Sequence, residues 1–269
     1  MSVSQVSEDR SIIERTFSVL EAFNFQDRSL TVSDISQRAC LPVATTYRIV
    51  TKLVSWGALE RIEGSRYSIG LRLWEIALLA PRHSALRAVA MPYMLQLHAR
   101  AGVSVTLAVR DELEGIWLEG VWTSEARCRG AVGNRFPLHA TAAGRVLLAH
   151  ASPETQEELY TRNLHAYTRW TQNDPLVLRA IVEQVKISGY AICDRELSES
   201  VCSVATPIFD GDGAVIAAIG QVTETENGDA AQRAELVLAT AKLISERFAA
   251  LHSAEYGKKR RRSRQQAPL

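Results

Sequence analysis

Apolar residues recur every three or four positions in two neighbouring segments, residues 31–39 and 42–56, and this spacing predicts two short helices. Ser33 and Asp34 offer side-chain oxygens to the unpaired N–H groups at the start of the first helix. Pro42 suits the first turn of the second helix, where a missing N–H costs nothing. The buried face of the first helix is expected to carry Val32, Ile35 and Ala39, and that of the second Val43, Ile49, Val50, Leu53 and Trp56.

The second helix also has a polar face. Thr45, Arg48 and Lys52 share one side of it, and residues 42–56 contain no acid. Such a face suits the major groove of DNA, because Arg and Thr can reach base edges while Lys and Arg bind phosphates. The alternative is an ordinary solvated face on a pair of packed helices.

A β-hairpin signal follows and favours DNA binding. Residues 58–62 and 65–70 alternate like strands, with Gly64 between them. A helix capped by Ser11 precedes the pair, and its apolar residues are expected to lie in the core: Ile12, Ile13, Phe17, Leu20 and Ala22 or Phe23. Three helices and then a hairpin is the order of a winged helix-turn-helix. Arg61 and Arg66 would lie on the wing, near the phosphate backbone.

Two further helical segments separate this domain from the rest. Residues 71–78 and 84–101 have helical spacing, with a break at Pro81. Apolar residues of the second segment cover more than one stripe, which suits burial between domains or against a second copy of the chain.

The second half predicts an α+β domain with an antiparallel sheet and helices packed on its faces. Strand patterns occupy residues 103–109, 115–121, 201–209 and 214–222, with hairpin signals at 111–114 and 210–213. Helical patterns occupy residues 153–163, 176–188 and 231–252. A further helix begins after the small residues 140–144, and such a helix start is a ready anion or carboxylate site. Close packing of a helix on a sheet requires small residues too, so both interpretations stay open.

Length and charge set the organisation of the whole chain. Its 269 residues and 46% hydrophobic content favour two modest domains. We expect a DNA-binding domain at 1–70, linker helices at 71–101, an effector domain at 102–253 and a disordered basic tail at 254–269. Because the formal net charge is only +1, any affinity for nucleic acid has to come from a local patch. The tail either adds non-specific attraction to DNA or only aids solubility.

Cysteine usage and hydropathy place the chain in the cytoplasm. The four cysteines, at 40, 128, 193 and 202, form no C-x-x-C pair and have no histidine at ligand spacing. We therefore expect no structural zinc, no disulfide framework and no cofactor. The first eleven residues contain no apolar segment of a secretion signal, and no stretch reaches the length of a membrane span.

Four segments in this order resemble the IclR family of bacterial transcriptional regulators, from about Ser11 to Leu251. These segments are Leu41-Pro42 with Thr45-Thr46-Tyr47-Arg48, residues 137–145, Gly189-Tyr190-Ala191 followed by Asp194 and Glu196, and residues 205–210. The resemblance implies a winged helix-turn-helix joined by a linker helix to a GAF-like effector domain. It also implies double-stranded operator DNA, a small carboxylate effector, and dimers that can pair into tetramers.

The resemblance also implies particular site residues. The DNA-binding set is Thr45, Thr46, Tyr47, Arg48, Lys52, Arg61 and Arg66. Backbone N–H groups at the helix start after His139 would hold the polar end of the effector. The full effector-binding set is His139, Ala142, Ala143, Gly144, Asp194, Glu196, Cys202, Ser203, Gln221 and Thr223. Family members often carry a pocket cysteine where this chain has Ser203, and since neighbouring strand residues face opposite sides, Cys202 is expected to point elsewhere.

Two other functions are open to the same residues. His139, Cys202 and Asp194 could be drawn as a nucleophilic set, but no sequence context of a known nucleophile accompanies them. Cys202 or Cys193 could make the regulator a redox sensor, although a free buried cysteine is usually inert. We therefore expect a regulator that is not an enzyme.

Overall fold

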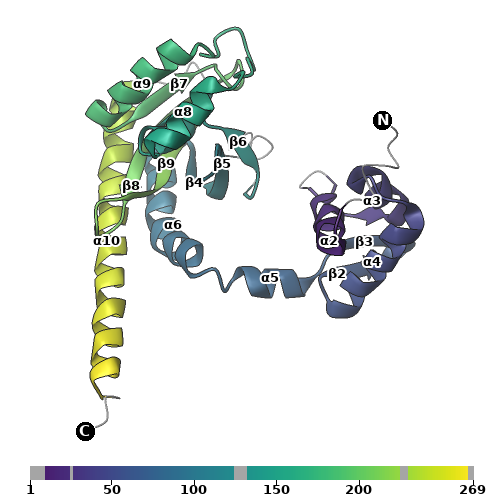
Figure 1. The fold of residues 1–269 in the computed structure, drawn as a ribbon. Coiled ribbons are helices and arrows are strands. Elements are labelled where there is room, and N and C mark those ends of the chain that lie inside the picture. Colours follow the sequence, from purple (N-terminus) through teal and green to yellow (C-terminus); the bar gives the residue numbers. More distant parts are fainter. Residues whose placement is uncertain (1–9, 25–26, 124–131, 225–229, 266–269) are drawn as a thin grey trace. The chain divides into compact units, whose positions relative to one another are not determined.

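A computed structural model describes residues 10–24, 27–123, 132–224 and 230–265 of the chain. The chain forms two compact units, Met1–Ser84 and Ala85–Leu269 (Figure 1). The first nine residues of the predicted DNA-binding domain and residues 266–269 of the predicted tail lie outside the described residues.

The first unit is a small three-helix domain with a three-stranded sheet. In chain order it contains α2 (Ile12–Glu21), β1 (Leu30–Thr31), α3 (Val32–Ala39), α4 (Val43–Trp56), β2 (Leu59–Ile62) and β3 (Arg66–Ile69). The strands pair antiparallel in the order β1-β3-β2, and Gly64 turns the hairpin with a φ of 71°. The predicted winged helix-turn-helix is confirmed, and β1 is an addition to the predicted hairpin.

The ends of α3 explain the tight turn before α4. Thr31, rather than Ser33, caps α3, and a reciprocal capping box joins Thr31 to Asp34. Cys40 ends the helix in the left-handed conformation, with φ 51°. Pro42 then stands at the N-cap of α4.

Parts of the predicted core are exposed instead. On α2 the side chains of Ile12, Ile13 and Phe17 are 64%, 62% and 56% exposed, while Val19 and Ala22 are buried. On α4 the core is Thr46, Ile49 and Val50, whereas Val43 and Trp56 are exposed. The prediction for these apolar residues was wrong because each helix has more apolar positions than its packed face can hold.

Two helices lead from the first unit into the second. They are α5 (Leu71–Ala77) and α6 (Pro81–Ala101). Pro81 begins α6, as a proline in a first helical turn can, so α6 starts three residues before the predicted Ser84.

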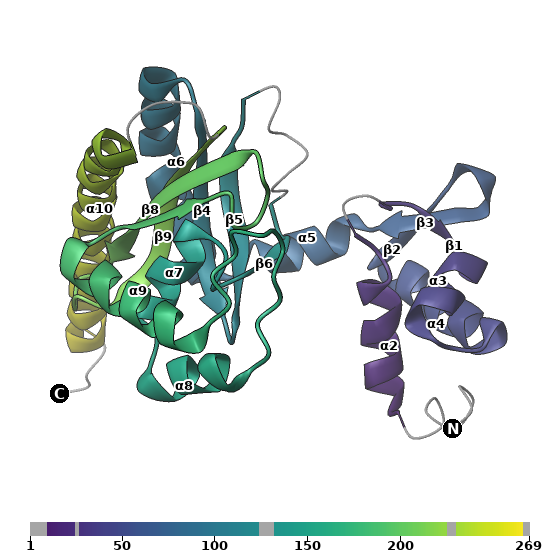
Figure 2. The ribbon, with the colours of Figure 1, turned by 90° about the horizontal axis from the view of Figure 1, so that it is seen from above.

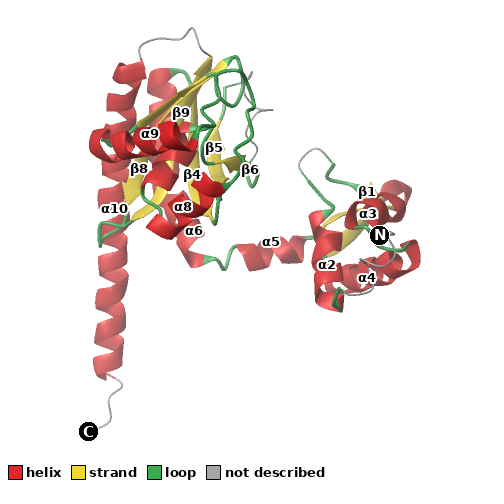
Figure 3. Ribbon diagram, turned by 45° about the horizontal axis from the view of Figure 1, so that its top comes forward, coloured by secondary structure: helices red, strands yellow, loops and turns green. Residues whose placement is uncertain are grey.

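The second unit is built on a six-stranded antiparallel sheet with the order β6-β5-β4-β9-β8-β7 (Figure 3). Its strands are β4 (Ser104–Asp111), β5 (Glu114–Val121), β6 (Arg135–Pro137), β7 (Ala191–Asp194), β8 (Val201–Phe209) and β9 (Val215–Glu224). β6 and β7 are additions to the predicted strands, and they are only three and four residues long.

Helices cover both faces of this sheet (Figure 2). One face packs against α7 (Ala142–Ala149), α8 (Pro153–Thr161) and α9 (Pro175–Ser188), around Val146, Leu148 and Leu178. The other packs against α6 and α10 (Ala230–Gln265), around Met94, Leu107 and Phe248. The sheet therefore separates two cores, and the predicted α+β class is confirmed.

The last helix runs into the predicted tail. α10 extends to Gln265 and so includes most of residues 254–269, which were expected to be disordered. Lys and Arg have good helix propensity, and no proline interrupts the helix before Gln265. Within the part of the chain that the structure describes, no helix combines the length and apolar character of a membrane span.

Candidate functional site

Three basic side chains line a groove between α2 and α4. Arg15 from α2 and Arg48 and Lys52 from α4 border a hollow of about 340 Å³. Thr16 and Thr45 add hydroxyl groups, and none of the described residues that line the groove is acidic. The predicted Thr45, Arg48 and Lys52 are thus brought together. Arg15 and Thr16 were missed, since nothing in the sequence places α2 beside this face of α4.

Two neighbouring residues of α4 have opposite environments. Tyr47 is 56% exposed and available to a partner, whereas Thr46 is fully buried. The Thr46 hydroxyl donates to the carbonyl of Pro42 at 3.1 Å, within the turn that begins the helix. The structure therefore does not support Thr46 as a DNA contact.

The two wing arginines also differ. Arg61 is exposed on β2, with Nη2 3.3 Å from the hydroxyl of Ser65. Arg66 is half-buried, and its guanidinium donates to both the hydroxyl and the carbonyl oxygen of Ser29. Arg66 therefore fastens β3 to the segment before β1, and only Arg61 is fully presented on the hairpin.

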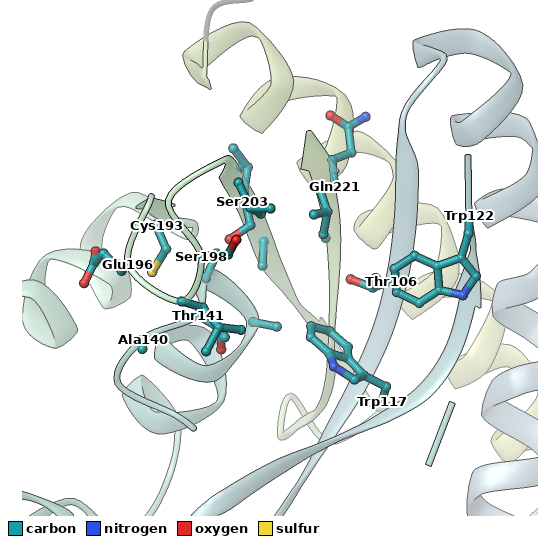
Figure 4. A pocket seen from close by; sticks show the side chains of 18 residues that line it. Thr106, Trp117, Trp122, Ala140, Thr141, Cys193, Glu196, Ser198, Ser203 and Gln221 are labelled. Atoms are coloured by element: carbon teal, nitrogen blue, oxygen red, sulfur yellow. The ribbon is translucent and has the colours of Figure 1, made fainter. Parts of the chain in front are cut away.

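A pocket of about 330 Å³ lies in the second unit between the sheet and the start of α7 (Figure 4). Trp117 and Trp122 border one side of it, and Cys193 and Glu196 lie on the opposite side. The predicted residues that line it are Ala142, Ala143, Glu196, Ser203 and Gln221. The lining residues that the sequence analysis missed include Thr106, Trp117, Trp122, Thr141, Cys193, Leu197 and Ser198.

The start of α7 provides two backbone donors to this pocket. Thr141 caps the helix, and its hydroxyl accepts from the N–H of Gly144 at 3.0 Å. Ala142 and Ala143 are the first two helical residues, so their N–H groups have no acceptor within the helix. Both line the pocket, where they can hold an anion at the positive end of the helix dipole.

Gly144 serves packing rather than binding. A Cβ at Gly144 would lie 2.5 Å from the carbonyl oxygen of Leu138, so only glycine fits there. Its N–H is already bonded to Thr141, and Gly144 is not among the pocket residues. The carboxylate-site interpretation therefore fits Ala142 and Ala143, whereas the packing interpretation fits Gly144.

His139 supports the loop before α7 from outside the pocket. Its Nε2 lies 2.9 Å from the carbonyl oxygen of His165, and its own carbonyl accepts from Nε of Arg145. Burial lowers the pKa of the His139 imidazole, with a smaller contribution in the same direction from Arg145. The predicted effector contact at His139 is not supported.

Glu196 is held in place by a buried ion pair. Its Oε2 accepts from Arg145 Nη2 at 2.6 Å and from the backbone N–H of Gln172 at 2.9 Å. The side chains of Arg145 and Glu196 are 3% and 8% exposed. This pair joins α7 to the loop after β7, which carries Leu197 and Ser198 to the edge of the pocket.

Strand parity decides which predicted residues of the sheet face the pocket. Ser203 faces it, as expected, and Cys202 lies on the other face, where Arg233 Nη2 is 3.2 Å from its sulfur. Thr223 pairs with Cys202 across the strands and contacts Arg233 too. Gln221 alternates with the pocket residues Gly220 and Val222, and its amide points away from the cavity (Figure 4). Gln221 thus borders the pocket only through its place on β9.

Asp194 does not reach the pocket. It is exposed, and its carboxylate accepts from Nη2 of Arg195 at 2.8 Å. Cys193, one residue earlier, faces the pocket instead, and burial raises the pKa of its thiol far above the usual range. Cys128 lies outside the described residues. Across the described ranges, no cluster of His, Cys, Asp or Glu could hold a metal ion.

A winged helix-turn-helix with a basic groove, on one chain with a second unit that contains a ligand-sized pocket, is typical of ligand-binding transcriptional regulators. Two family models match the chain: the IclR helix-turn-helix domain over residues 12–63, and the bacterial transcriptional regulator IclR C-terminal domain over residues 80–246. The chain belongs to the IclR family of bacterial transcriptional regulators.

Several members of this family are similar over most of the chain. The Pca regulon regulatory protein of Pseudomonas putida is 29% identical over 80% of this chain and 76% of its own length. The transcriptional repressor IclR of Escherichia coli is 27% identical, over 87% of this chain and 88% of its own.

One solved structure extends the comparison to a bound ligand. It is an IclR homologue from Microbacterium hydrocarbonoxydans in complex with 4-hydroxybenzoate. It is 34% identical, with a TM-score of 0.85, and the match covers 89% of this chain and 100% of that one.

Proposed function

We propose that this regulator binds an operator through α4 and the β2–β3 hairpin, and that a small carboxylate in the pocket changes its affinity for that operator. The observation that carries the proposal is the placement of the Ala142 and Ala143 N–H groups at the wall of a largely apolar pocket. The 4-hydroxybenzoate bound by the Microbacterium relative supports a carboxylate as ligand.

The DNA contacts divide into base readers and phosphate contacts. Arg48 and Thr45 are the proposed base readers, with the exposed Tyr47 beside them. Lys52 and Arg61 are the proposed phosphate contacts, together with Arg15 across the groove. Arg66 is retained as a weaker phosphate contact, because its guanidinium already holds Ser29.

The regulator acts as a homodimer, and two dimers can form a tetramer. The first unit supports this part of the proposal with an apolar surface on α5 and just beyond it, where Leu71, Trp74, Ile76, Leu78 and Leu79 are 64%, 58%, 47%, 45% and 76% exposed. Contiguous exposed apolar residues of this kind mark association surfaces. A two-fold dimer requires two operator half-sites related by the same symmetry. The regulator works in the cytoplasm, where its operator DNA lies.

No catalytic role is proposed. Asp194 and Cys202 are paired across β7 and β8, on the face of the sheet away from the pocket, whereas His139 lies in the buried loop before α7. The histidine is therefore not placed to act as a base for Cys202.

Fluorescence anisotropy with the full chain tests the proposal. Binding to fragments of the upstream DNA of its own gene is compared with binding to random DNA of equal length, with and without each member of a carboxylate panel. We expect one fragment to be preferred and one carboxylate to change its dissociation constant, because a ligand shifts DNA affinity only when it binds the free and DNA-bound states differently. Equal affinity for all DNA would contradict the proposal, as would indifference to every carboxylate.

A further inference from the structure

Two glycines of β5 leave room for a group of aromatic rings beside the pocket, formed by Trp117, Trp122 and Phe136 and called here the aromatic wall. A Cβ at Gly115 would lie 2.1 Å from the ring of Phe136, and a Cβ at Gly120 would lie 2.4 Å from the ring of Trp122. Phe136 in turn stacks on Trp117, with 4.0 Å between ring centroids and 27° between planes. Trp117 and Trp122 both line the cavity. The strand therefore presents flat ring surfaces because its glycines leave room for them.

Backbone hydrogen bonds also hold Trp117 in place. Its backbone N–H donates to Asn134 at 3.1 Å, and its carbonyl accepts from Gly133 at 2.7 Å. Together with the Phe136 stack, these bonds hold the indole against the edge of the sheet. A ring held in this way favours planar ligands, since offset stacking adds to the gain from burial.

The charged groups around the cavity restrict the number of negative charges that a ligand can carry. Among the described residues that line the cavity there is no lysine, arginine or histidine, and the single carboxylate is that of Glu196. Arg145 and the N–H of Gln172 already satisfy Glu196 Oε2, and the Cys193 thiol stays neutral because burial raises its pKa. Within the described lining, the backbone N–H groups of Ala142 and Ala143 at the start of α7 are placed to bind an anion.

From these two features we propose that the pocket selects a flat aromatic ring bearing one carboxylate and rejects ligands with a second negative charge. This inference rests on the proposed function, since it names the effector class of the same site. The carboxylate binds at Ala142 and Ala143 and the ring lies along Trp117 and Trp122. A second carboxylate would be desolvated with no cation among the described lining residues to pair with it.

Hydroxyl groups add a further preference. Thr106, Ser198 and Ser203 line the same cavity and can exchange hydrogen bonds with a polar substituent on the ring (Figure 4). A ring hydroxyl can therefore be accommodated at no cost in charge, whereas an ionised substituent cannot.

Thermal-shift and calorimetric titrations of the full chain test this inference without DNA. The probes are benzoate, 4-hydroxybenzoate, cyclohexanecarboxylate, terephthalate and succinate. We expect at least one of the two benzoates to bind, and cyclohexanecarboxylate, which has the same charge without the flat ring, to bind about tenfold more weakly or worse. Terephthalate and succinate should not bind.

A matched pair of variants tests the role of the wall. Trp117→Leu should weaken the better benzoate about tenfold or more and bring its affinity close to that of cyclohexanecarboxylate. Trp56→Leu, at the end of α4 and outside the pocket, should leave both affinities unchanged. Circular dichroism of each variant checks that it is folded. If Trp117→Leu does not fold, the titrations of the wild-type protein with the five ligands still test the inference.

Three results would overturn the inference: no binding of either benzoate, a dicarboxylate that binds as tightly, or no preference for the flat ring. If a different carboxylate binds and alters operator affinity, the proposed function stands and only this inference fails. If no operator is bound, the proposed function fails, while the ligand titrations still decide the effector class.

Discussion

Arg145 and Glu196 form a buried ion pair that holds the pocket loop to α7, with 2.6 Å between Nη2 and Oε2. The other guanidinium nitrogens of Arg145 donate to the carbonyls of His139 and Ile192. Thr171 completes the cluster by donating to the backbone carbonyl of Glu196 at 2.6 Å. One arginine therefore joins three segments of the chain around the pocket.

Replacing Glu196 with glutamine should destabilise the second unit by about 3–5 kcal/mol, because it leaves the Arg145 charge buried without a counter-charge. Urea unfolding followed by circular dichroism measures the change. Glu158→Gln is the control, since it removes an exposed pair with Arg162 whose side chains are 58% and 59% exposed. That control should change stability by less than about 1 kcal/mol. Equal effects of the two substitutions would show that the buried pair contributes little.

Arg48→Ala should remove the preference for operator over random DNA, because an arginine at a base edge carries discrimination of about 1–3 kcal/mol. Lys52→Ala should instead weaken binding to both DNAs alike and reduce the slope of log affinity against log salt by about one. Anisotropy titrations at several salt concentrations separate the two effects. Retained discrimination in Arg48→Ala would refute its assignment as a base reader.

Thr45 and Thr46 form a matched pair for testing which hydroxyl meets DNA. Thr45→Val should weaken operator binding, because Thr45 lies on the basic groove beside Arg48. Thr46→Val should leave operator affinity unchanged and lower stability by about 1 kcal/mol, through loss of its buried hydrogen bond to Pro42. Anisotropy measures the first effect and urea unfolding the second. A loss of operator affinity in folded Thr46→Val would contradict the buried position of that side chain.

Acidification should destabilise the second unit through His139. Burial lowers the pKa of this imidazole below 6.5, so between the folded and unfolded pKa values the unfolded chain binds more protons. The contribution to stability is therefore complete above about pH 6.5 and is lost as the pH falls through the folded pKa. Urea unfolding at pH 7.5 and pH 5.5 should give a smaller pH dependence for His139→Gln than for the wild type. Burial also lowers the pKa of His150, which is present in both the wild type and His139→Gln, so part of the pH dependence should remain in the variant.

The sequence predicted the architecture more fully than the pocket. Periodicity and hairpin signals are local, so they located α3, α4 and the wing hairpin, and strand parity correctly placed Ser203 on the pocket side. The aromatic wall was missed because it depends on β6, a strand too short to show a pattern. A register shift between Leu107 and Ala108 also decides which residues of β5 face the pocket. Arg145 and Glu196 are 51 positions apart, and no local pattern predicts their meeting.

A second ion pair connects the pocket strand to α6. Arg87 on α6 donates through Nε to Glu119 Oε2 at 3.0 Å, and Oε1 of Glu119 accepts from the N–H of Gly120, whose neighbour in space is Trp122. Because α6 also spans the boundary between the two units at Ser84 and Ala85, we propose that this pair couples ligand binding to operator binding.

Glu119→Gln should therefore uncouple ligand binding in the pocket from operator binding. We expect ligand affinity and operator affinity, each measured alone, to stay near their wild-type values. The ratio of operator affinities with and without ligand, which spans about 5–150-fold in allosteric proteins, should move towards one. Arg135→Gln is the matched control, because it removes two exposed pairs, with Asp111 and Glu114, beside the same strand. A Glu119→Gln protein whose operator affinity still responds fully to ligand would show that the coupling runs through other contacts of α6.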